Sequence, residues 1–374
     1  MKIGFFGQLY GKKLQDSISL DNTMNYAIQK FNKNFVNALS LFSEVKVYSP
    51  VKHKANKIFS ELDGRTEYRY LFYSGKIGRL ILLMNSFLKC FCGSESIYFF
   101  DALNISQSVG VILAKKVKKK KAIGIITDIP QDILDGHPGI FGKLFLYILR
   151  NCDAMVVLTE QTNLDYNSRK KPYVIVEGIA NDLQIYERRT LDKKICIYAG
   201  GLLKKYHVDQ LAECFSKIAK ENEYLHIFGD GESCSNIKHI AESCSQVKYM
   251  GTADNQTVVK HEMAATLLIN PRTNEGTYTK YSFPSKLIEY MSTGVAVLGN
   301  RLDGVPAIYS DYMFLFDGNS DIQCQETLRR ILDMDSIELQ SIGGRAKDFV
   351  LSRNGIQATS HKLKGLLYDM GFKE

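Results

Sequence analysis

The sequence lacks features that would place it in several classes of protein. No uninterrupted apolar run approaches the roughly 20 residues of a membrane-spanning helix; Leu80–Met84 is the best, and polar residues soon follow it. None of the eight cysteines forms a C-x-x-C pair, which argues against a zinc site and a secreted disulfide framework. Gly7 and Gln8 interrupt the amino-terminal apolar stretch, which is too short for a signal peptide. We therefore expect a cytoplasmic protein that does not span a membrane.

Length and composition are those of an ordinary globular protein. The chain has 374 residues, of which 45% are hydrophobic and 24% are charged, with a formal net charge of +8. This composition is too apolar for a disordered chain, and the length suggests two domains. The sequence shows no fixed-period repeat and no low-complexity segment apart from one lysine cluster.

Short apolar runs alternate with helical patterns along the whole chain, which is typical of βαβ units with parallel strands. In the first half, the predicted strands are Lys2–Phe6, Glu44–Tyr48, Ser96–Phe100, Ala122–Thr127, Ala154–Leu158 and Tyr173–Val176. In the second half, they are Ile195–Ala199, Tyr224–Phe228, Val247–Tyr249, Thr266–Asn270, Val295–Gly299 and Met313–Phe316. The predicted helices include Tyr26–Leu41, Ile140–Leu149, Val208–Ala219, Thr257–Ala264 and Ser285–Ser292.

A polar segment without periodicity, residues 179–194, predicts the linker between two domains. We expect a first domain over residues 1–180, a second domain over 181–354, and a terminal helix within 355–374 that packs back on the first domain. Two doubly wound sheets in tandem would face a central cleft at their carboxyl-terminal edges, where open α/β sheets bind ligands.

The segment from Asn270 to Gly294 is the most informative in the chain. A buried strand ends at Asn270, a polar loop follows, and a helix begins near Pro284 or Ser285. Proline suits a first helical turn, and Ser282 or Ser285 can cap the free N–H groups. We expect the helix to end at Gly294.

The start of this helix suits an anion, because its free N–H groups and dipole both favour negative charge. Phe283–Lys286 is therefore a candidate cradle for a diphosphate. Glu289 follows Ser285 by four residues on the same helix face, where its carboxylate could accept hydrogen bonds from vicinal hydroxyls. A nucleoside diphosphate sugar offers both groups; the alternative is a capped helix with a solvated glutamate.

Phe283–Lys286, Glu289–Met291 and Thr293–Gly294 together resemble the donor-site signature of retaining glycosyltransferases of family four, which have the GT-B fold. Asn270–Arg272 combined with the Tyr281–Lys286 sequence resembles the variant in bacterial enzymes that build surface glycans. Flanking segments are similar to the strands and turns of that family's carboxyl-terminal domain: Tyr198–Leu202, Ile227–Glu232 and Val247–Gly251. The resemblance is specific between about residues 195 and 305.

Two departures from the family pattern concern its charged residues. The family often has two glutamates separated by seven residues, and Tyr281 stands in place of the first. The resemblance implies that Glu289 binds the nucleotide ribose, and Glu275 is the nearest substitute for the missing acid.

Where relatives hold the diphosphate with an arginine and a lysine, this chain has Gly201 and Tyr206. A departing pyrophosphate needs a cation, and we favour Lys205 and Lys286. The other available cations are Lys204 and Arg272.

The resemblance implies that the domain over 181–354 binds the nucleotide sugar and that the N-terminal domain over 1–180 lies on the acceptor side. Other candidates belong to this acceptor side. The turn Gly7–Gly11 follows a strand and could let the backbone approach a phosphate or the acceptor. Asp128 follows the strand 122–127 and could orient or deprotonate an acceptor hydroxyl, or simply cap the next segment. His137 is a second acceptor-side candidate, whereas we interpret His207 as a surface residue.

Lys115–Lys121 is a dense positive run that could attract anionic lipid head groups. Together with the apolar, basic segment Lys76–Lys89, it suggests peripheral docking on the inner face of the cell membrane. The alternative is a solvated helix end. Nucleic acid is not expected as a partner, because no recognised binding motif accompanies the run.

The resemblance implies sugar transfer from a nucleotide-sugar donor, a UDP-sugar in our interpretation, to a hydroxyl of a glycan or lipid-linked glycan. It also implies retention of anomeric configuration and no cofactor or protein-bound metal. Because the usual acid and arginine are absent at Tyr281 and Gly201, the alternative is a catalytically inactive GT-B partner or scaffold of a glycosyltransferase complex.

Overall fold

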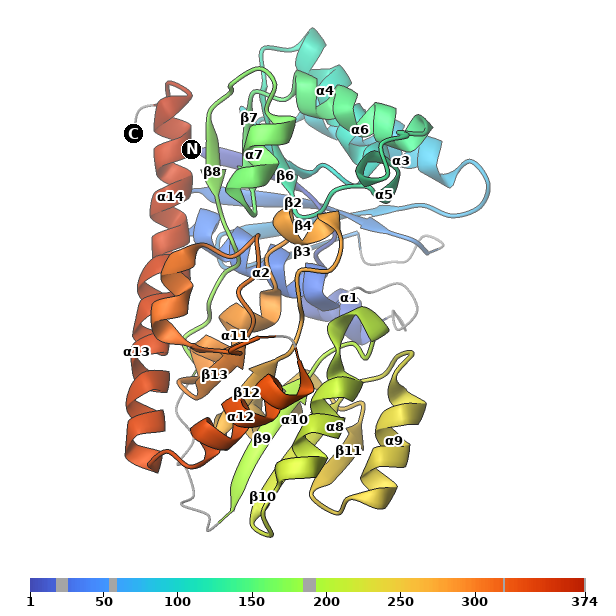
Figure 1. The fold of residues 1–374 in the computed structure, drawn as a ribbon. Coiled ribbons are helices and arrows are strands. Elements are labelled where there is room, and N and C mark those ends of the chain that lie inside the picture. The colour runs from blue at the N-terminus through green and yellow to red at the C-terminus, as the bar shows by residue number, and fades with distance from the viewer. Residues whose placement is uncertain (18–25, 54–58, 184–192, 319, 373–374) are drawn as a thin grey trace. The chain divides into compact units, whose positions relative to one another are not determined.

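The structure is a computed structural model that describes residues 1–17, 26–53, 59–183, 193–318 and 320–372. The chain forms two compact units (Figure 1). Unit 1 comprises Met1–Ile179, Lys280–Phe283 and Ile356–Glu374, and unit 2 comprises Ala180–Thr279 and Pro284–Gly355. Lys280–Phe283 thus cluster with unit 1, although the expected second domain included them. Most of the predicted linker, residues 184–192, lies outside the described residues.

Unit 1 is built on an eight-stranded sheet of order β3-β4-β2-β1-β5-β6-β7-β8. All neighbouring strands are parallel except the β3–β4 pair, a hairpin that the sequence analysis missed. Its strands are β1 (Lys2–Phe6), β2 (Glu44–Val51), β3 (Ser60–Asp63), β4 (Thr66–Phe72), β5 (Ile97–Asp101), β6 (Lys121–Ile126), β7 (Ala154–Val157) and β8 (Tyr173–Ile175).

Helices cover both faces of this sheet, because successive residues of a strand point to opposite sides. Phe5 packs with α2 and the terminal helix α14, whereas its neighbour Phe6 belongs to the cluster that includes residues of α3, α4 and α6. The helices are α1 (Lys12–Ser17), α2 (Tyr26–Ser40), α3 (Gly78–Cys92), α4 (Ile105–Val117), α5 (Gln131–Leu134), α6 (Ile140–Asn151), α7 (Glu160–Tyr166) and α14 (Ile356–Asp369).

Unit 2 contains a six-stranded parallel sheet of order β11-β10-β9-β12-β13-β14. Its strands are β9 (Lys194–Ala199), β10 (Glu223–Phe228), β11 (Val247–Gly251), β12 (Leu267–Asn270), β13 (Ala296–Gly299) and β14 (Phe314–Leu315). The strand order reverses between β9 and β12. Loops that leave neighbouring strands at such a switch point diverge, so ligands bind there in open α/β sheets.

The helices of unit 2 form two packed groups. One contains α8 (Val208–Ile218), α9 (Cys234–Ser243) and α12 (Asp321–Leu332), and the other contains α10 (Asn255–Met263), α11 (Ser285–Thr293) and α13 (Ser336–Asn354). Short helices are η1 (Lys204–Tyr206), η2 (Thr277–Lys280) and η3 (Ala307–Tyr312). Among the described helices of both units, none is long and apolar enough to cross a bilayer.

Candidate functional site

The loop after β9 is held by the turn after β10. Leu202 N–H donates to the carbonyl of Asp230 over 2.9 Å, and Tyr198 Oη donates to the Gly201 carbonyl over 2.7 Å. Gly231 has φ of 151°, and a Cβ atom there would lie 2.7 Å from the carbonyl carbon of Leu202. The close approach therefore requires a glycine at position 231, and it fixes the course of the loop that carries Lys204 and Lys205.

Two predicted cations from different loops meet on one aromatic ring. Lys205 Nζ, from the loop after β9, lies 4.6 Å from the centroid of the Tyr278 ring. The Arg272 guanidinium carbon, from the loop after β12, lies 5.0 Å from the same centroid. Both cations also contact the Tyr206 ring, each at 5.7 Å. Cation–π attraction thus holds two positive charges at the switch point, and Tyr206 supports them where relatives have a lysine.

The other two residues predicted in this loop play different parts. Lys204 is exposed, and its backbone N–H donates to Glu232 over 3.3 Å. Gly201 is exposed, and a Cβ atom at this position would meet the Tyr206 ring at 3.7 Å, an ordinary contact. Packing therefore does not require a glycine at position 201.

The start of helix α11 lacks the expected cap. Pro284 is the N-cap residue and makes no side-chain cap hydrogen bond, so neither Ser282 nor Ser285 occupies the N-cap position. Ser285 is the exposed first residue of the helix, whereas Ser282 and the buried Phe283 belong to unit 1. An apolar Phe283 side chain gains more from burial than from a place beside a solvated anion. The predicted cradle Phe283–Lys286 is therefore divided between the units.

Lys286 lies between two carboxylates. Its Nζ is 3.3 Å from Glu289 one turn along α11 and 3.6 Å from Glu262 of α10, whose side chain is wholly buried. The sequence analysis missed Glu262, because a glutamate in a helix ordinarily indicates a solvated face. Tyr290, which follows Glu289 in α11, accepts a 2.9 Å hydrogen bond from Ala199 N–H. This bond anchors α11 at the carboxyl end of β9. The positive charge of Lys286 is thus partly balanced within the protein.

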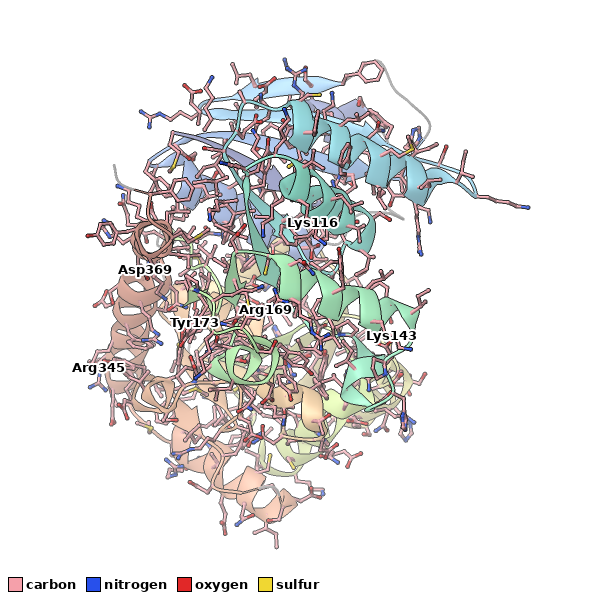
Figure 2. All side chains as sticks on the ribbon, turned by 90° about the horizontal axis from the view of Figure 1, so that it is seen from above. Lys116, Lys143, Arg169, Tyr173, Arg345 and Asp369 are labelled. Carbon is pink, nitrogen blue, oxygen red and sulfur yellow. The ribbon has the colours of Figure 1, made fainter. Side chains whose placement is uncertain are left out.

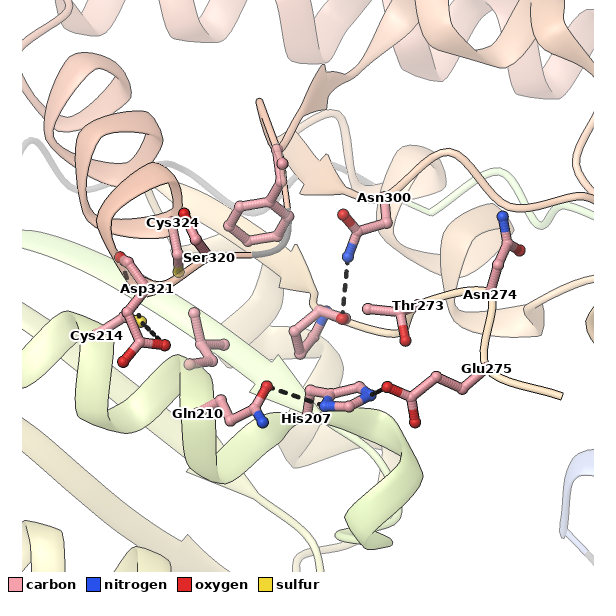
Figure 3. A pocket seen from close by; sticks show the side chains of 14 residues that line it. His207, Gln210, Cys214, Thr273, Asn274, Glu275, Asn300, Ser320, Asp321 and Cys324 are labelled. Atoms are coloured by element: carbon pink, nitrogen blue, oxygen red, sulfur yellow. Dashed lines mark hydrogen bonds and ion pairs between the residues drawn. The ribbon is translucent and has the colours of Figure 1, made fainter.

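His207 is part of a pocket, and its interpretation as a surface residue is wrong. Its side chain is only 14% exposed, and Nε2 lies 3.0 Å from Oε1 of Glu275 while Nδ1 lies 2.9 Å from Gln210 (Figure 3). The backbone of His207 is left-handed, with φ of 56°. This pocket, about 330 Å³ in volume, lies between α8, the loop after β12, and the residues Phe316, Gly318, Ser320 and Asp321. It brings Glu275, the predicted substitute for the missing acid, beside Thr273 and Asn300.

The acceptor-side candidates lie in unit 1. Asp128 is exposed just after β6, and its Oδ1 accepts the N–H of Ile129 over 2.8 Å. Gly7 is buried, and a Cβ atom there would lie 2.7 Å from the Phe5 ring, so packing explains this glycine. His137 is exposed.

The turn after Gly7 has little capacity for an anion. The N–H groups of Leu9, Tyr10 and Gly11 already donate to side-chain oxygens. Their acceptors are Ser49, Gln29 and Tyr70. Of the two acceptor-side turns, the one at Asp128 is therefore the better placed to meet a ligand.

Solved structures of similar fold are GT-B glycosyltransferases, which have two Rossmann-like domains. A sucrose-phosphate synthase from Thermosynechococcus elongatus superposes with a TM-score of 0.71 at 12% identity, covering 99% of each chain. The lipopolysaccharide outer core galactosyltransferase WaaB superposes with a TM-score of 0.64 at 14% identity, covering 99% of this chain and 100% of the other. HepE from Anabaena, in complex with UDP, superposes with a TM-score of 0.66 at 12% identity, covering 98% of this chain and 100% of the other. The GT-B fold predicted from the sequence is confirmed.

A family model adds what the fold alone does not show. Residues 184–349 match the family described as "Glycosyl transferases group 1". No curated protein matches the chain. The matched residues include the Lys205–Tyr278–Arg272 cluster, α11 and the pocket at His207.

Proposed function

We propose that this protein is a retaining, metal-independent glycosyltransferase of bacterial surface polysaccharide synthesis. It would move a sugar from a UDP-sugar to a hydroxyl of a glycan or lipid-linked glycan. The glycosyl transferases group 1 domain supports this class of reaction. Two structures of similar fold support the donor class, since HepE is in complex with UDP and an E. coli protein is bound with UDP-2-fluoro glucose.

The observation that carries the proposal is the convergence of Lys205 and Arg272 on Tyr278 at the switch point. When the bond from the sugar to the diphosphate breaks, negative charge grows on the departing oxygen. Cations already in place stabilise that charge without reorganisation, which is usually the largest catalytic contribution. In our proposal these two side chains do this without a metal.

The remaining site residues would bind the donor and orient the acceptor. Glu289 would accept hydrogen bonds from the ribose hydroxyls, and Lys286 would hold its carboxylate in place. Arg272 thereby takes the part that the sequence analysis assigned to Lys286, because Lys286 is already paired with two carboxylates. The N–H groups at Ser285 would face the diphosphate, and Asp128 would orient the acceptor hydroxyl.

Calorimetric titration of the full chain with UDP and a panel of nucleotide sugars tests the donor class. We expect UDP to bind, and Lys205→Ala or Arg272→Ala to weaken binding about tenfold each. Lys116→Ala is a matched control, because Lys116 contacts the Tyr147 ring at 5.0 Å in unit 1 and its loss should leave the affinity unchanged. If the wild type binds no nucleotide, the proposal fails.

One observation favours the alternative of an inactive GT-B partner of a glycosyltransferase complex. At the position of the first family glutamate, Tyr281 is buried in unit 1 and bonded to Asp165. A scaffold of this kind would neither hydrolyse a nucleotide sugar nor transfer the sugar from one. Release of UDP from the donor that binds tightest in the titration would therefore exclude the scaffold.

A further inference from the structure

Helix α3 has an apolar stripe on its exposed side. Ile77, just before the helix, and Leu80, Met84 and Leu88 within it are 66%, 58%, 55% and 50% exposed. Their spacing of three to four residues places them on one side of the helix. A second stripe that includes Leu82 is buried and supplies the contact with the core. The exposed stripe is therefore additional to what folding requires.

Two neighbouring helices extend this apolar surface. A Cβ atom on Gly110 of α4 would lie 2.5 Å from the Leu83 carbonyl of α3, so these helices pack backbone to backbone. Lys116 of α4 donates to the Tyr147 hydroxyl of α6 over 2.7 Å. Figures 1 and 2 show the three helices side by side, with Lys116 and Lys143 labelled in Figure 2.

The exposed apolar side chains of Ile77, α3, α4 and α6 are here called the α3–α4–α6 face. Val117 on α4 and Ile140 and Phe141 on α6 are 65%, 81% and 43% exposed. The face holds nearly half of the large hydrophobic side chains that are exposed among the described residues. Such a concentration marks an interaction surface rather than scattered exposure.

The charges on these helices have one sign. None of the three helices contains an aspartate or glutamate, while Arg79, Lys89, Lys143 and Arg150 are exposed on them. Of the carboxylates that lie near α6 in the sequence, Asp132 accepts the N–H groups of residues 139 and 142, and Asp153 pairs with Lys115 over 3.0 Å. Asp135 is exposed and accepts a 2.8 Å hydrogen bond from Gln131. The face is thus both apolar and positively charged.

The structure does not present the predicted membrane contact, Lys115–Lys121, as one free cluster. Lys115 Nζ donates to the Asn151 carbonyl over 2.6 Å, and Lys120 Nζ donates to the Gly93 carbonyl over 2.8 Å. Two lysines of the run are therefore bound within the fold. Lys118 and Lys119 stay exposed at the end of α4, at the border of the face.

We propose that the α3–α4–α6 face inserts its apolar side chains into the surface of an anionic phospholipid bilayer. Leucine, isoleucine and phenylalanine would enter the boundary of the acyl chains, and the surrounding lysines and arginines would meet the anionic head groups. A surface without a carboxylate on any of its three helices matches the uniform negative charge of such a membrane. This inference rests on the proposed function, because that function gives the membrane contact its purpose.

Vesicle sedimentation with the full chain tests the surface. We expect co-sedimentation with vesicles of equimolar phosphatidylglycerol and phosphatidylcholine, and little with phosphatidylcholine alone. Leu80→Glu combined with Leu144→Glu, the latter at an exposed position of α6 on the same face, should weaken binding at least about tenfold. Each substitution removes an inserted side chain and adds a repelled charge. Ile322→Glu combined with Ile337→Glu, at exposed positions of α12 and α13, changes the net charge equally and should have no effect.

The absence of tryptophan in the chain allows a second, direct test of insertion. Met84→Trp introduces a single reporter whose emission should shift to the blue with anionic vesicles and be quenched by brominated lipid. Ile337→Trp in unit 2 should show neither effect.

The proposal is overturned if the wild type does not sediment, if the Leu80 and Leu144 double variant binds normally, or if only Ile337→Trp responds. Binding that is lost only in a Lys118→Glu, Lys119→Glu double variant would mean contact through head-group charge alone, and would also overturn it. UDP binding by each variant, measured separately in the absence of vesicles, distinguishes failure of this proposal from failure of the donor site.

Discussion

The hydroxyl of Tyr281 donates a 2.7 Å hydrogen bond to Oδ2 of Asp165. The Tyr281 ring also meets the edge of Tyr166 at a centroid distance of 5.5 Å, and the preceding carbonyl, of Lys280, accepts from Thr159 over 3.0 Å. Burial and the bond to Asp165 raise the pKa of Tyr281 to about 12. The position at which relatives have an acid is therefore occupied here by a residue that anchors Lys280–Phe283 in unit 1.

Tyr281→Phe should lower the free energy of unfolding by about 1 kcal/mol, the usual contribution of one hydrogen bond. Tyr281→Glu should cost more, because it loses the aromatic contact and places a second carboxylate beside Asp165. Urea unfolding of the two variants measures the difference. A Tyr281→Glu variant that keeps wild-type stability and gains transfer activity would show that the position still serves the sugar site.

Lys286→Ala should destabilise the protein by about 2 kcal/mol or more, because it removes the cation that pairs with the wholly buried Glu262. It should also weaken UDP binding, since Glu289 loses its positioning partner. Adding Glu262→Gln should recover part of the stability but not the binding. Equal recovery of both quantities would mean that Lys286 affects the donor site only through folding.

Glu289→Ala should leave the fold intact and weaken donor binding by about tenfold, which corresponds to about 1.4 kcal/mol. The effect should disappear with a donor analogue that lacks the ribose hydroxyls, because those hydroxyls are the proposed partners. Titration calorimetry with the two ligands provides the comparison. The ribose assignment is wrong if the variant binds both ligands as the wild type does.

Two substitutions of His207 separate the cost of its left-handed backbone from the loss of its side-chain contacts. His207→Ala and His207→Gly both remove the bonds to Glu275 and Gln210, but only glycine adopts the left-handed backbone without cost. The glycine variant should therefore be about 1 kcal/mol more stable than the alanine variant in thermal or urea unfolding. Equal stabilities would show that the backbone there relaxes away from the left-handed region.

A half-buried histidine in β10, His226, should make stability depend on pH. Burial, with Lys248 and His261 nearby, lowers the pKa of His226 to about 4, and its Nδ1 is buried with no hydrogen-bond partner among the described residues. In the unfolded chain histidine titrates near 6.5. As pH falls from about 6.5 to about 4, the unfolded state binds the proton first, so stability should fall by on the order of 2 kcal/mol. In His226→Gln this part of the pH dependence should vanish.

Much of the local structure could be predicted from the sequence. The helix predicted over Ser285–Ser292 spans Ser285–Thr293, and the strand predicted over Lys2–Phe6 is exact. Apolar runs and helical periodicity indicate which face of a strand or helix is buried. The helix ends at Gly294 because this residue adopts a left-handed backbone, with φ of 74°. The β3–β4 hairpin was missed because charged residues interrupt Thr66–Phe72 and obscure its apolar pattern.

Local chemistry alone therefore accounts for the alternating strands and helices, the loops that carry Lys205 and Arg272, and the helix that carries Glu289. Which side chains meet was set by packing between segments far apart in the chain. That packing brought the two cations to Tyr278, buried Glu262 beside Lys286, and bonded Tyr281 to Asp165. Periodicity records only whether a side chain is buried, whereas the identity of its partner depends on how the strands are ordered in the sheet.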